Sequence, residues 1–180
     1  VPELMRDTAT TSWALMSSTL AGLGHLEGEE VSIAADGNAA PPLTVSGGSI
    51  TLGTPAAVAH VGLPITCDLE TLPINQTTRS GDNLRGSFKN IPHVGLVLHR
   101  SRGVFVARDR RDFEADKNLI ELRQRDDEDW AESTNMLTGY TRLAIPTGWD
   151  QDGRIFVRQS DPLPLTILSI IPEVQLGGKG

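Results

Sequence analysis

Histidines and a single cysteine are the side chains of this 180-residue chain best suited to metal binding and nucleophilic chemistry. None of His25, His60, His93 and His99 stands four residues from another, the spacing that places two ligands on one face of a helix. On a strand, His93 and His99 would share a side but lie about 20 Å apart, too far for one ion. A lone Cys67 excludes an internal disulfide and a cysteine-based zinc site, and is interpreted as a small residue in a strand. We expect no metal site and no cofactor.

Motifs of enzyme active sites are missing as well. The sequence contains no G-x-S-x-G elbow, no P-loop and no complete G-x-G-x-x-G, because Glu27 replaces the third glycine after Gly22 and Gly24. The adjacent carboxylates at 126–129 are typical of a solvated acidic loop, and Asp150 and Asp152 of a turn. A glycosidase pair can come from any two carboxylates, and nothing singles one out. We therefore expect a protein that is not an enzyme.

Positive charge is concentrated in one part of the chain. Although the net charge is −7, eight of the 16 Lys and Arg residues lie between positions 100 and 125, interleaved with five acidic residues. Two interpretations remain open: a mixed-charge solvated or subunit-contacting face, and a patch that faces phosphate. Few aromatic side chains lie nearby, so sequence-specific readout of a nucleic acid is not expected. The candidate patch consists of Arg100, Arg102, Arg108, Arg110 and Arg111.

Short extended runs must position these side chains. The sequence has 18 Gly and 11 Pro, and roughly nine to eleven strand-like runs follow one another at the spacing of an antiparallel sheet protein. We expect an all-β sandwich- or barrel-like domain with long polar loops. A lead-in segment, 1–24, should precede a single β-domain over 25–176, with loops near 75–92 and 126–138. The apolar run 165–171 is predicted to be a central strand buried on both faces.

One turn and two hairpins are predicted. Asp36-Gly37 follows the alternating run that begins at Val31, and Asp-Gly accommodates positive φ at both positions. The segment 46–49, Ser-Gly-Gly-Ser, separates two further strand-like runs. A second hairpin is expected around 101–103, between a strand on which Val94, Leu96 and Leu98 share one face and the run 104–107.

Two segments carry a resemblance to a known family. The first is GLGHLEGEEVSIAADG, residues 22–37, continued by apolar runs up to residue 73. The second is GWDQDGRIFVRQSDPLPLTILSIIPEV, residues 148–174. Together they resemble a domain of tail proteins from short-tailed bacteriophages, namely the tail nozzle (tail tubular protein B) and the related packaged-DNA stabilisation proteins. The matched parts cover about 80 residues and include no catalytic motif. Residues 75–140 match only loosely.

The residues of these two segments have expected structural roles. Two should satisfy backbone groups at the entry to a strand, four glycines should allow turns or close backbone approach, and two prolines should fix the chain before the last strand. A tryptophan should anchor the core or an interface, and two arginines should pair with carboxylates across the sheet. The backbone-satisfying residues are His25 and Glu27, and the glycines are Gly28, Gly37 (with Asp36 before it), Gly62 and Gly153. The prolines are Pro162 and Pro164, the tryptophan is Trp149, and the arginines are Arg154 and Arg158.

The resemblance also implies partners and a location. A member of these families would form a ring, six copies around a DNA channel, in the virion's tail. It would contact the adaptor or tail tube, and double-stranded DNA would pass without sequence readout. Family members are longer than this chain, so we expect an excised domain or a shorter protein that reuses it. The alternative is a tail or surface module that binds a host glycan or protein. No run is apolar enough for a membrane span.

Overall fold

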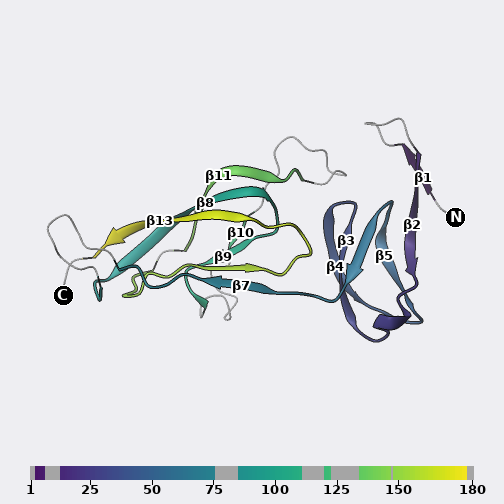
Figure 1. Ribbon diagram of the computed structural model, residues 1–180, viewed down its shortest axis with the longest axis horizontal. Helices are drawn as coiled ribbons and strands as arrows, with labels where there is room; N and C mark the ends of the chain where they lie inside the picture. The colour runs from purple at the N-terminus through teal and green to yellow at the C-terminus, as the bar shows by residue number, and fades with distance from the viewer. Residues whose placement is uncertain are drawn as a thin grey trace. The chain divides into compact units, whose positions relative to one another are not determined.

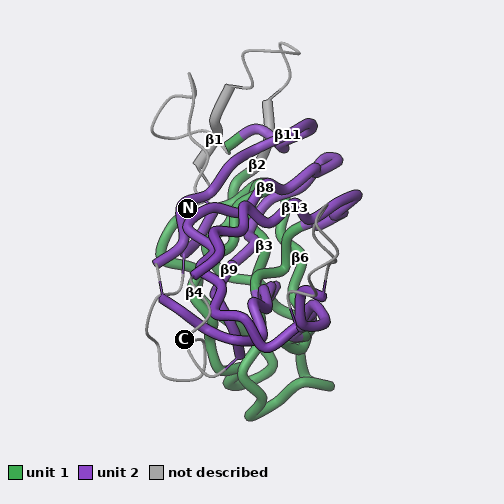
Figure 2. The backbone as a smooth tube through the Cα atoms, turned by 90° about the vertical axis from the view of Figure 1, so that its left-hand side faces the viewer, with its two compact units in different colours: residues 1–65, 126–134, 161–163 green, residues 66–125, 135–160, 164–180 purple. Residues whose placement is uncertain are grey.

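The computed structural model describes residues 3–6, 13–75, 85–110, 120–122, 134–146 and 148–177. These residues form antiparallel sheets joined by turns (Figure 1), which confirms the predicted all-β class. The chain divides into two compact units, unit 1 (1–65, 126–134 and 161–163) and unit 2 (66–125, 135–160 and 164–180), drawn in green and purple in Figure 2. This differs from the single domain expected over 25–176. The first division falls where exposed Leu63 and Ile65 link two strands of different sheets.

Unit 1 contains two three-stranded sheets, with strand orders β1-β2-β5 and β4-β3-β6. Alternating side chains of β3 and β5 form one buried core, in which Val31 and Ile33 are both fully buried. Because β2 pairs with β5, residues 13–21 belong to this unit and are not a lead-in segment. The elements are β1 (Glu3–Arg6), β2 (Trp13–Ala21), the 3-10 turn η1 (Gly24–Leu26), β3 (Glu30–Ala35), β4 (Asn38–Thr44), β5 (Ser49–Ala56) and β6 (Ala59–Gly62).

Unit 2 is a sandwich of a three-stranded sheet, β11-β8-β13, and a four-stranded sheet, β10-β9-β12-β7. The inner faces of both sheets contribute to one core, with Val94, Leu96 and Leu98 from β8 meeting Val106 and Val157 from the other sheet. The strands are β7 (Cys67–Glu70), β8 (Lys89–Ser101), β9 (Phe105–Ala107), β10 (Ile120–Glu121), β11 (Leu137–Ala144), β12 (Phe156–Gln159) and β13 (Ile167–Leu176).

The apolar run near the C-terminus is not the central strand that the sequence predicted. Among the described strands β13 pairs with β8 alone, and Leu168 and Ile171 are 65 % and 44 % exposed. The central strand is β8, which pairs with β11 on one side and β13 on the other. The apolar run therefore lies at an edge of the described sheet, and the longer strand β8 lies at its centre.

The predicted turn and the two predicted hairpins had different outcomes. Asp36 and Gly37 have φ of 46° and 79° and join β3 to β4 as expected. At 46–49 the turn forms, but the strands then diverge, because β4 pairs with β3 and β5 with β2. The hairpin around 101–103 was wrong: β8 and β9 belong to different sheets. Of the expected loops, 85–88 precedes β8 and 134–136 precedes β11, while 76–84 and 126–133 lie outside the described residues.

Candidate functional site

The first segment of the resemblance builds a turn in unit 1. The two carboxylate oxygens of Glu27 accept hydrogen bonds from the backbone N–H groups of Gly47 and Gly48, at 2.8 and 2.7 Å. Both glycines have positive φ, so they present adjacent N–H groups to one acceptor. Glu27 thus satisfies backbone groups as predicted, although at a turn and not at a strand entry. His25, in η1, is exposed.

Asp36 has a second role besides its turn with Gly37. Its carboxylate accepts hydrogen bonds from the N–H groups of Ala57 and Val58, between 2.8 and 3.1 Å, and this fixes the connection from β5 to β6. Gly28 has φ of +81°, which supports the predicted turn role. Gly62 does not fit that role: it lies in β6 without positive φ, and a Cβ there would meet open space.

Replacing Glu27 by alanine should destabilise unit 1 by about 1 kcal/mol, because two hydrogen bonds to a charged acceptor are lost at an exposed turn. Glu27→Gln, which keeps an acceptor oxygen, should retain part of that stability. Urea unfolding monitored by circular dichroism measures both. Equal stability of Glu27→Ala and the wild type would show that the turn does not need the carboxylate.

The second segment folds around a buried lysine in unit 2. Lys89 is 1 % exposed, and its Nζ donates hydrogen bonds to the carbonyl oxygens of Gln151, at 2.6 Å, and Ser87, at 3.1 Å. Gly153 has φ of +61°, and a Cβ there would lie 3.0 Å from the Lys89 side chain, so both conformation and space favour glycine. Nothing in the sequence pattern had indicated a role for Lys89, because its shorter hydrogen bond is to the carbonyl group of Gln151, 62 residues away.

Trp149 is exposed and does not belong to the core. Its side chain is 54 % exposed and lies beside Phe88, 46 % exposed, over the backbone of Gly177. At the preceding Gly148 the Arg108 guanidinium occupies the space of a Cβ, so a larger residue there would displace that side chain. The core part of the Trp149 prediction was wrong, and its interface part stays a prediction.

Both arginines of the second segment pair with carboxylates of β7, as expected. Arg158 on β12 donates two hydrogen bonds to Asp68, at 2.6 and 2.7 Å, and Arg154 lies 3.5 Å from Glu70. The Arg158 guanidinium also lies 5.5 Å from the centre of the Phe156 ring. These contacts tie β12 to β7 at the edge of the described sheet.

The Arg158 pair should make stability depend on pH. Hydrogen bonds from Arg158 hold the pKa of Asp68 below its ordinary 3.8. This contribution is complete above that ordinary value and is lost as the pH falls through the lower folded pKa. For a partly exposed pair we expect up to about 1 kcal/mol. Asp68→Asn should therefore be less stable than wild type at pH 7, and the difference should close toward pH 2 in guanidinium unfolding. An equal difference at both pH values would contradict this assignment.

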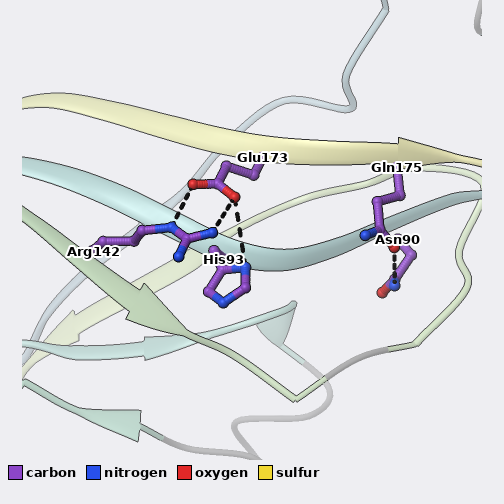
Figure 3. A network of polar contacts seen from close by, with 5 residues as sticks. All are labelled: Asn90, His93, Arg142, Glu173 and Gln175. Atoms are coloured by element: carbon purple, nitrogen blue, oxygen red, sulfur yellow. Dashed lines mark hydrogen bonds and ion pairs between the residues drawn. The ribbon is translucent and has the colours of Figure 1, made fainter.

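A polar network that the sequence did not predict spans the outer face of the β11-β8-β13 sheet (Figure 3). Arg142 on β11 donates two hydrogen bonds of 2.6 Å to Glu173 on β13, and Nδ1 of His93 on β8 lies 3.6 Å from the same carboxylate. The Arg142 hydrogen bonds lower the pKa of Glu173, and the same contacts raise the pKa of Arg142. Asn90 and Gln175 add a second cross-strand hydrogen bond at 3.1 Å. All five groups are occupied with holding three strands together.

The predicted arginine patch is distributed over several elements. Arg100 and Arg102 lie at the end of β8 and just after it, Arg108 and Arg110 follow β9, and Arg111 lies outside the described residues. Arg108 fits against Gly148, and Arg110 is close enough to Asp68 to contribute to its lowered pKa. Arg102, Arg108 and Arg110 therefore all have interactions within the chain.

Arg100 differs from the other described members of the patch in its backbone. Its φ is +46°, in the region that favours glycine, and this costs on the order of 1 kcal/mol. The cause is a bulge in β8, where His99 and Arg100 together face Thr138 of β11. The Arg100 N–H donates to Oγ1 of Thr138 at 2.9 Å, while its side chain is exposed.

The two prolines and the cysteine singled out in the sequence are exposed. Pro162 and Pro164 are exposed before β13, and the Pro164 carbonyl accepts a hydrogen bond from Arg102 at 2.9 Å. Cys67 lies in β7, as predicted, with an exposed side chain. Within the described ranges, no three His, Cys, Asp or Glu side chains are close enough together to hold a metal ion.

Comparisons with known proteins add no family to this description. The chain matches no known protein family, and it matches no curated protein. In the part of the chain that the structure describes, no helix combines the length and apolar character needed to cross a bilayer.

Proposed function

We propose that this chain is a structural β-module of a ring-forming phage tail protein, of the nozzle or DNA-stabilisation kind, which lines or supports the channel for DNA ejection. Its mechanism is passive. Packed sheets form the wall, and an acidic lumen repels phosphate, so that double-stranded DNA slides past without sequence readout. The ring would contain six copies, joined head to tail and seated on the adaptor or tail tube. The protein breaks no bonds and would be found in the virion.

One observation carries the proposal: the side chains of the residues behind the resemblance make contacts that hold the fold together. Glu27 stabilises the turn at Gly47 and Gly48, and Asp36 stabilises the connection from β5 to β6. Arg158 joins β12 to β7. Gly153 makes room for a buried lysine. Contacts of this kind are what a rigid wall requires, and they leave these carboxylates and guanidinium groups already engaged within the fold.

Negative-stain electron microscopy of the natural full-length protein tests this proposal. We expect class averages of rings with a central opening wide enough for duplex DNA. Images that contain only separate protomers, at concentrations where the protein is intact and folded, would contradict it. A sample heated beyond its unfolding transition serves as the control for aggregates.

The alternative, a module that binds a host glycan, is favoured by one feature. Trp149 and Phe88 are both exposed and both lie against Gly177, and exposed aromatic rings can stack against sugar rings. A glycan array tests it: discrete binding that Trp149→Ala abolishes, and that Leu168→Ala at another exposed apolar position retains, would support this alternative. Arrays without binding would remove it.

A further inference from the structure

Charge is divided very unequally between the two units. Over the sequence, unit 1 contains twelve acidic residues and one basic residue, Arg6, while unit 2 contains eleven acidic and fifteen basic residues. The formal charges are −11 and +4, which together give the −7 of the chain. No Lys or Arg occurs between Arg6 and Arg79. The two units therefore have opposite charge, which suits them to attract each other between copies.

A cationic side chain of unit 2 is exposed at a strained position. Arg100 is held at φ of +46° by the bulge in β8, where glycine would fit without strain. Among the described residues, the Arg100 guanidinium has no hydrogen bond or ion pair, although its backbone N–H is satisfied by Thr138. His99 is exposed beside it. Strain kept at an exposed charge points to a contact outside the protomer.

Unit 1 carries the matching groups. Glu29 and Glu30 are exposed at the start of β3, and neither carboxylate has a hydrogen bond or ion pair with a described residue. Their neighbour Glu27 is occupied by the turn at Gly47 and Gly48. Two adjacent unpaired carboxylates thus lie in a unit whose sequence from position 13 to 65 has no basic residue.

We propose that Arg100 of one copy contacts Glu29 and Glu30 of the next copy, so that the basic unit of each protomer docks on the acidic unit of its neighbour. This contact is heterologous, because two different surfaces meet, and a heterologous contact that closes on itself forms a ring. The inference rests on the proposed ring and names the pair of surfaces that joins it. Nucleic acid is the less favoured partner of Arg100, because it would approach a chain of net charge −7 that already carries an acidic unit of its own.

Charge reversal in the natural full-length protein tests the contact. Arg100→Glu, and separately Glu29→Arg with Glu30→Arg, should each raise the dissociation constant of the ring by on the order of 100-fold, because like charges then face each other. Combining all three substitutions should restore the ring. Arg85→Glu, which changes the net charge of unit 2 by the same amount at another exposed arginine, is the control for net charge and should assemble normally. Thermal melts confirm that each variant folds, and Arg100→Gly removes the charge at a position where glycine is unstrained.

The outcomes separate this inference from the proposed function. If Arg100→Glu still forms the ring, or if the triple variant does not form it, the proposed contact is overturned. The ring itself then stays a proposal. A wild-type protein that never forms a ring would overturn both. An intact Arg100→Glu ring that no longer retains duplex DNA in a gel-shift assay would assign Arg100 to phosphate and overturn the contact between copies.

Discussion

Replacing Leu96 by alanine should lower the free energy of unfolding of unit 2 by about 2–5 kcal/mol. Leu96 is fully buried in β8, the central strand of its sheet, and packs in the core between the two sheets. The truncation removes apolar contacts and leaves a cavity that neighbours on both sides cannot easily fill. Guanidinium unfolding followed by circular dichroism measures the loss.

Leu168→Ala is the matched control for this experiment. Leu168 lies on β13 and is 65 % exposed, so the same truncation should cost less than about 1 kcal/mol. If Leu168→Ala destabilised the protein as much as Leu96→Ala, the centre of the sheet would lie at β13 and the strand order described above would be wrong.

Replacing Ile33 by alanine should destabilise unit 1 by about 2–5 kcal/mol and leave unit 2 protected. Ile33 is fully buried in β3, within a core whose buried members all lie in unit 1. Hydrogen exchange measured by mass spectrometry should therefore accelerate in β3–β5 and remain slow in β8.

Val58→Ala, at a side chain that is 57 % exposed in the same unit, is the control and should leave exchange unchanged. Equal acceleration of exchange in β3 and β8 after the Ile33 substitution would mean that the two compact units unfold as one cooperative domain, which is what the sequence alone had suggested.

Local signals in the sequence predicted local structure well. Asp36-Gly37 produced the expected turn because both residues tolerate positive φ, and the alternation of Val94, Leu96 and Leu98 correctly placed them on one buried face. The pairing of Arg158 with a carboxylate across the sheet was also anticipated, although its partner, Asp68, is 90 residues away and could not be named.

Non-local pairing is where prediction from the sequence failed. An apolar run has the same composition whether it lies at the centre of a sheet or at its edge, so the residues of β13 did not show that only β8 would pair with them. A short turn such as 101–103 does not reveal whether the strand that follows continues the same sheet or crosses to the facing one. The division into two units depends on the same long-range contacts.

The polar network of unit 2 could not be predicted from the sequence, because it too depends on which strands pair. Glu173, Arg142 and His93 come from three strands and meet only because β11, β8 and β13 lie in that register. Arg100 was included in the predicted patch on its charge alone. Its strained backbone, which makes it different from its neighbours, follows from a bulge that no residue of the segment 99–102 signals.

Mass photometry of the natural full-length protein over rising concentration shows whether it assembles into a closed ring. We expect a species of six protomer masses, which becomes less abundant as salt screens the attraction between the acidic and basic units. A single species of one protomer mass at every concentration and salt level would contradict it.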